Sequence, residues 1–137
     1  MAQRIYLGVM AALYFASALY AYLDPAALGQ WLGIASLADS GHTEIRATYG
    51  GLVLGSGLVL AAGVWSRNFA LAGLLSTVLG MGCLVLTRLA AEVFSGGPGI
   101  DANQGIVIVF EGVAVALAVF FARRALRENR KLADSRY

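Results

Sequence analysis

The most unusual residues of this chain are polar side chains inside long apolar stretches: Arg46, Tyr49, Arg88, Glu92 and Glu111. If these stretches cross a membrane, each charge near a helix centre costs about 2.5–3.5 kcal/mol. A carboxylate beside a guanidinium offsets part of that cost, and the same two groups can bind an anionic ligand or move a proton. We therefore take these five residues as the candidate site.

Composition supports a membrane location for them. Of the 137 residues, 59% are hydrophobic and 13% are charged, whereas soluble domains have about 25% charged residues. Mean hydropathy is +0.73. So small a chain could not cover a soluble core with so few polar residues. These values indicate a membrane protein and exclude a soluble enzyme, a nucleic-acid-binding protein and a disordered tail.

Four apolar stretches approach or exceed the length needed to cross a bilayer core, about 20 helical residues. A helix breaker or a charged residue closes each, and none alternates with period two as barrel strands do. The sequence predicts an all-α fold with one integral membrane domain, a four-helix transmembrane bundle. The expected helices lie at about 5–23, 44–65, 69–94 and 105–122, followed by a basic cytoplasmic tail at 123–137.

The segment between the first two helices carries a signal of its own. Pro25 suits the first position of a helix, and Trp31 suits the headgroup region of a bilayer. We expect a short interfacial helix there.

Basic residues indicate the orientation. Arg4, Arg67 and six residues after Phe121 are basic, whereas 24–43 and 92–104 contain no Lys or Arg. The positive-inside rule then places both termini in the cytoplasm, as expected for a multi-pass protein of a bacterial inner membrane. The final basic cluster is also suited to holding anionic lipid or an acidic partner.

Depth and spacing predict how the buried charges pair. Arg88 and Glu92 are four residues apart and share a helix face. Glu111 has only apolar neighbours one turn away on its own helix, so its partner must come from another helix, and Arg88 has the matching depth. We expect Arg46 to lie in the same outward layer. That layer is either a clamp that sets helix register or a ligand or proton site.

Small residues recur at four-residue spacing in three of the expected helices: Gly51 and Gly55, Ser76 and Gly80, and Gly112 and Ala116. The same helices carry further glycines at Gly50, Gly57, Gly63 and Gly73. Such faces allow close backbone contact between helices in lipid. They predict packing within the chain or, alternatively, a homo-oligomer interface.

Residues for metal or cofactor chemistry are scarce. His42, expected in a loop, is the one histidine and Cys83 the one cysteine. These two residues cannot build an ordinary zinc, haem or di-iron site, and Cys83 cannot form an intrachain disulfide. We expect no metal and no cofactor.

The run from Glu44 to Gly55, EIRATYGGLVLG, resembles a bacterial family of small four-helix membrane proteins catalogued as a domain of unknown function. The resemblance extends over nearly the whole chain: Arg88, Pro98 and Glu111 fit the family's pattern, while Gly96-Gly97 stands where members often have Asp-Gly. It implies the fold and the Arg/Glu layer, and no chemistry.

Three functions fit these observations. The first is binding of a small amphipathic, lipid-like ligand or a partner subunit at the Arg/Glu layer. The second is a membrane-embedded enzyme acting on a lipid or isoprenoid, with Glu111 as general acid and base. The third is a small oligomeric transporter or proton-coupled channel. The sequence leaves open whether the protein is an enzyme.

Overall fold

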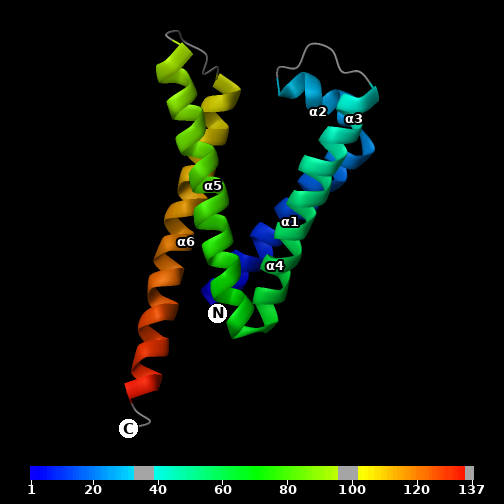
Figure 1. Cartoon of the computed structure of the whole chain (residues 1–137). Coiled ribbons are helices and arrows are strands. Elements are labelled where there is room, and N and C mark those ends of the chain that lie inside the picture. Colours follow the sequence, from blue (N-terminus) through cyan, green and yellow to red (C-terminus); the bar gives the residue numbers. More distant parts are fainter. Residues whose placement is uncertain (33–38, 96–101, 135–137) are drawn as a thin grey trace. The chain divides into compact units, whose positions relative to one another are not determined.

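Every regular element that the structure describes is a helix (Figure 1). The structure is a computed structural model that describes residues 1–32, 39–95 and 102–134. Four helices are long and apolar enough to cross a membrane, and a short helix lies between the first two. The predicted all-α class is confirmed, with four helices that are long and apolar enough to span a membrane. The glycine-rich turn around Pro98 lies outside the described residues.

Internal contacts divide the chain into two compact units, Met1–Gly73 and Leu74–Tyr137. The first unit begins with α1 (Ala2–Leu23) and α2 (Pro25–Trp31). Asp24 separates the two helices, and its Oδ1 accepts a hydrogen bond from the Ala27 N–H at 2.9 Å. The chain therefore turns sharply at the end of α1, because Pro25 and the Asp24 cap both favour a new helix start.

The second span of this unit contains three helical segments: α3 (Asp39–Ile45), the π-helix η1 (Arg46–Leu52) and α4 (Val53–Trp65). It begins at Asp39, five residues before the expected position 44. His42, expected in a loop, is therefore half-buried within a helix. The expectation was wrong because the polar residues 39–44 continue the helix, with Asp39 favourable at its N-terminus.

The π-helix has no clear sequence signal. π-helical geometry is rare, usually limited to one turn, and frequent at functional sites. Here it spans seven residues, including Arg46, Tyr49 and the pair Gly50-Gly51. Because a π-turn is wider than an α-turn, the i,i+3 neighbours expected for an α-helix, such as Arg46 and Tyr49, are not stacked in the same way.

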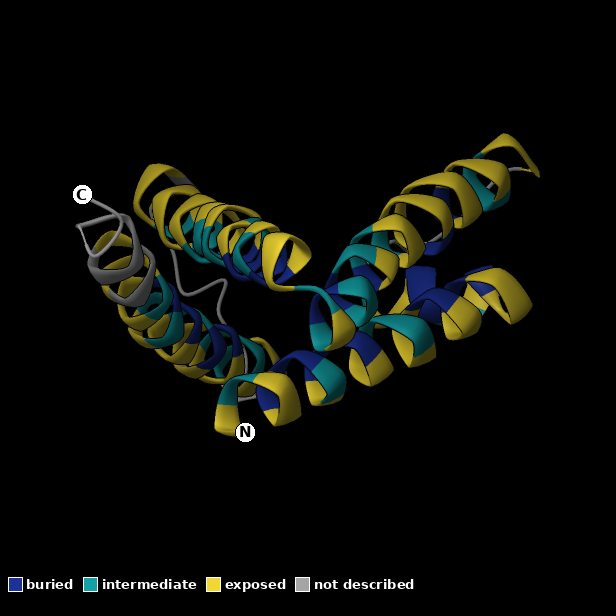
Figure 2. Ribbon diagram, turned by 90° about the horizontal axis from the view of Figure 1, so that it is seen from below, coloured by how far each residue is buried: buried dark blue, intermediate teal, exposed yellow. Residues whose placement is uncertain are grey.

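Two glycines bring α4 close to its neighbours. A Cβ added at Gly57 would lie 2.9 Å from the Phe15 ring, and one at Gly63 would lie 3.0 Å from Ala70 Cα. Leu7 and Leu60 are fully buried beside them, and Figure 2 shows burial confined to one side of each helix. Close backbone contact, as expected for helices in lipid, holds this unit together.

The glycines of the expected four-residue spacings behave differently. An added Cβ at Gly51 or Gly55 would meet no described atom within 4 Å, and the same holds for Gly80 and Gly112. Among the described residues, the close packing expected within the chain is therefore found at Gly57 and Gly63, and no such contact is found at Gly51, Gly55, Gly80 or Gly112.

The second unit contains most of α5 (Arg67–Ser95) and all of α6 (Ala102–Asp134), which run side by side in opposite directions (Figure 1). α6 has 33 residues, a length of about 50 Å at 1.5 Å per residue. The expected tail at 123–137 is thus helical as far as Asp134. The sequence after Gly112 has neither Gly nor Pro and is rich in Ala, Leu and Arg, so nothing in it ends the helix.

Substitution of Gly63 tests the close contact. We expect Gly63→Ala to lower the thermal unfolding temperature in detergent, because the new methyl group would press on Ala70 backbone. Overpacking costs about 1–3 kcal/mol, more than the helix propensity of alanine returns. Gly55→Ala is the matched control and should leave the melting temperature unchanged or higher, since its Cβ meets open space. Circular dichroism measures both melting temperatures. If the two variants melt at the same temperature, the close contact at Gly63 is contradicted.

Candidate functional site

An ion pair joins α5 and α6 within the segments that are long and apolar enough to cross a membrane. Arg88 Nη1 donates a hydrogen bond to Glu111 Oε2. The Glu111 side chain is 8% exposed and the Arg88 side chain 33%. The pairing predicted from depth is confirmed, and it connects helices that the sequence separates by 23 positions.

The positions of both residues along their helices explain the match. Glu111 stands nine residues after the start of α6, and Arg88 stands seven residues before the end of α5. At 1.5 Å per residue these offsets are about 14 Å and about 10 Å. Antiparallel helices therefore bring the two side chains to similar heights.

Small residues continue the buried side of α6 below Glu111. Ala114, Ala118 and Ala122 are all buried, and they follow Glu111 at spacings of three and four residues, so the four share one face. The alanines leave room for close helix contact along this stripe, and Glu111 is its polar end.

The chemistry of the pair follows from its surroundings. A charge-assisted hydrogen bond is stronger than a neutral one, and stronger still where water is excluded. A guanidinium carries five N–H donors in a planar fork, more than one carboxylate uses. Since Arg88 retains one third of its exposure, its guanidinium can reach a second anionic group while it holds Glu111.

Arg46 has a partner that sequence reasoning missed. Its Nε donates a hydrogen bond to the backbone oxygen of Tyr22 at 3.1 Å, in the last turn of α1. Carbonyls at a helix C-terminus lack intrahelical donors and attract cations. The sequence feature that could have predicted this bond is the end of the first helix at Asp24-Pro25. A helix end there leaves carbonyls without intrahelical donors, and Arg46 at the start of the second span can donate to them.

The remaining predicted site residues are placed as follows. Glu92 lies one turn after Arg88 in α5 and is half-buried, and Tyr49 lies in η1 with 41% exposure. Arg46 and Tyr49 belong to the first unit, and Arg88, Glu92 and Glu111 to the second. A single layer containing all five stays a prediction. Among the described residues, no three His, Cys, Asp or Glu side chains are grouped so that they could hold a metal ion.

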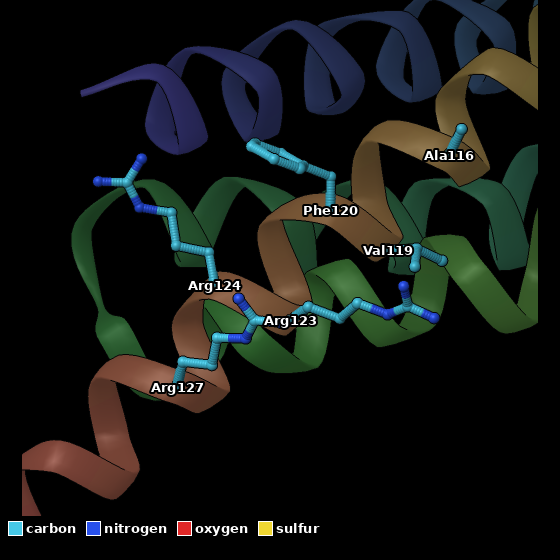
Figure 3. A pocket seen from close by; sticks show the side chains of 6 residues that line it. All are labelled: Ala116, Val119, Phe120, Arg123, Arg124 and Arg127. Carbon is cyan, nitrogen blue, oxygen red and sulfur yellow. The ribbon is translucent and has the colours of Figure 1, made fainter.

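A separate hollow lies near the other end of α6, where the sequence indicated a basic flank suited to anionic lipid or an acidic partner but no hollow. Figure 3 shows its lining, with apolar side chains followed by three arginines. Its volume is about 440 Å³, and the residues that line it are Ala116, Val119, Phe120, Arg123, Arg124 and Arg127. The signal was present in the spacing, since these residues recur at three and four positions and share one helix face.

A double-mutant cycle tests the ion pair. We expect Arg88→Met and Glu111→Leu each to destabilise the protein, because each leaves a charge without its partner in the apolar segment. The double variant should be less destabilised than the sum of the two, with a coupling free energy of about 1–3 kcal/mol. Unfolding titrations in mixed detergent micelles measure this. Additive losses would mean that the pair contributes nothing to stability.

Comparisons with protein-family models, curated proteins and solved structures give no match to this chain. The resemblance to a family of small four-helix membrane proteins therefore stays a prediction that rests on the motif residues alone.

Proposed function

We propose that this multi-pass membrane protein binds a small amphipathic ligand with an anionic group at the Arg88–Glu111 pair. The observation that carries the proposal is the unequal burial of the pair: Glu111 is 8% exposed and Arg88 33%. Glu111 fixes the guanidinium from its buried side, and the exposed side of Arg88 presents further N–H donors. Ionisable residues within a membrane span are costly and usually functional.

The other two functions receive less support from the same contacts. An enzyme or a proton-coupled channel requires Glu111 to exchange protons with a substrate or with water. Its carboxylate is instead buried and engaged by Arg88. Binding is the function that needs no movement of this pair.

We also infer the location and orientation from charge. The described helices fit a multi-pass membrane protein, and the positive-inside rule favours an inner membrane with both termini in the cytoplasm. In that orientation the Arg88–Glu111 pair lies in the outward half of the membrane, so the ligand would enter from the outer leaflet.

Native mass spectrometry of the purified full chain tests the proposal. We expect a small-molecule adduct on the wild type that is lost in Glu111→Gln and in Arg88→Lys. Lysine keeps the charge of position 88 but not the planar fork that binds two anionic groups together. Arg67→Lys, on the same helix, is the control and should retain the adduct.

The outcomes distinguish a binding site from a structural clamp and from a subunit interface. Loss of the adduct with unchanged melting of Arg88→Lys supports a binding site. Absence of any adduct, with Glu111→Gln clearly less heat-stable, would overturn the proposal and reduce the pair to a structural clamp. A second protein mass in place of a small molecule would overturn it in favour of a partner subunit.

A further inference from the structure

The C-terminal half of α6 carries an amphipathic hollow, which is distinct from the Arg88–Glu111 pair. Its lining changes from apolar to cationic along one helix face: Ala116, Val119 and Phe120, then Arg123, Arg124 and Arg127. We propose that this hollow binds the head group and the upper acyl chain of an anionic glycerophospholipid.

The position of the hollow relative to a membrane supports a lipid. The candidate span in α6 is Gln104–Arg127, and about 20 helical residues cross the hydrocarbon core. Counted from Gln104, the core ends near Arg123. The three arginines therefore stand at head-group level, and Ala116 and Phe120 stand beside the first methylenes of the acyl chains.

Because α6 is continuous, its basic residues are held in fixed positions relative to one another. A flexible tail would spread its charges over many directions, but α6 continues to Asp134 without a break. Arg123 and Arg127 are therefore fixed one turn apart on the same face. Basic pockets beside membrane helices bind anionic head groups, and arginine suits phosphate because of its planar fork.

The apolar part of the lining favours a lipid over a free phosphate or an acidic peptide. Ala116 is a small, exposed residue, and Phe120 is 58% exposed and lies edge-on to Phe121. The same face continues toward the N-terminus of α6 through Gly112, where an added Cβ would meet no described atom within 4 Å. An acyl chain could lie along this strip, whereas a free phosphate would use the arginines alone.

The test uses the full chain in detergent with an equimolar mixture of phosphatidylglycerol and phosphatidylcholine, and native mass spectrometry counts each bound lipid. We expect the wild type to retain phosphatidylglycerol preferentially. Arg127→Gln should lower its occupancy about fivefold, the effect of about 1 kcal/mol per basic residue at a membrane surface. Arg130→Gln removes the same charge three residues further along α6 and outside the hollow, and it should change occupancy less than twofold.

Two further arms distinguish a bound lipid from a free phosphate held by the arginines. Phe120→Ala should lower retention of phosphatidylglycerol, whereas Leu126→Ala, also exposed on α6, should not. An excess of glycerol 3-phosphate, which has no acyl chains, should fail to displace the lipid.

The proposal is overturned if Arg127→Gln and Arg130→Gln have equal effects, because binding is then diffuse electrostatic attraction. It is also overturned if glycerol 3-phosphate competes fully, or if the wild type shows no preference for the anionic lipid. The readout does not depend on the proposed function, since Arg88→Lys should leave the phosphatidylglycerol count unchanged.

Discussion

The ion pair between Arg88 and Glu111 is the interaction on which the second unit depends. Neither charge is tolerable alone at its depth, since an unpaired ion in hydrocarbon costs several kcal/mol. Together they tie α5 to α6 at one height. Because the contact requires the two side chains to lie at similar heights, the pair favours one register of α5 against α6 as well as balancing the two charges. A binding role for Arg88 uses the same geometry, because Glu111 holds the guanidinium in a fixed orientation.

The first unit depends on a different constraint, the absence of a side chain at two glycines. At Gly57 and Gly63 the neighbouring atoms lie within about 3 Å of where a Cβ would stand. Lipid provides no hydrophobic driving force for helix association, so contact at short range must supply it. Arg46 then bonds to the last turn of α1 through Tyr22, which gives the charge a partner from the backbone instead of an acidic residue. Arg46 and Arg88 are thus satisfied in two different ways, by a neutral backbone oxygen in the first unit and by a carboxylate in the second.

Helix α6 connects two sites of opposite character. Near one end it presents a buried carboxylate to Arg88, and near the other it presents exposed arginines beside an apolar strip. Sixteen residues separate Glu111 from Arg127, about 24 Å along the helix. That distance approaches the thickness of the hydrocarbon core, about 30 Å. A ligand at the first site and a lipid head group at the second would therefore occupy opposite leaflets.

The sequence by itself determined the all-α class, the four apolar spans, the short helix at Pro25 and the Arg88–Glu111 pairing. Each of these follows from local composition or from depth, because an apolar run must be helical in lipid and a buried charge must find its opposite. It also indicated the basic end of the chain, as a topological signal and as a segment suited to anionic lipid or an acidic partner, but not the hollow that lies there.

Only the tertiary structure decided the rest. The π-helix at Arg46–Leu52, the early start of the second span at Asp39 and the bond from Arg46 to Tyr22 depend on which backbone groups come together in space. The continuation of α6 to Asp134 placed three arginines around one hollow. Whether a glycine meets a neighbour or open space, as at Gly63 and Gly55, depends on which helix face turns toward another segment. Residue spacing alone does not carry that information, because every helix presents several small-residue faces and only packing selects among them.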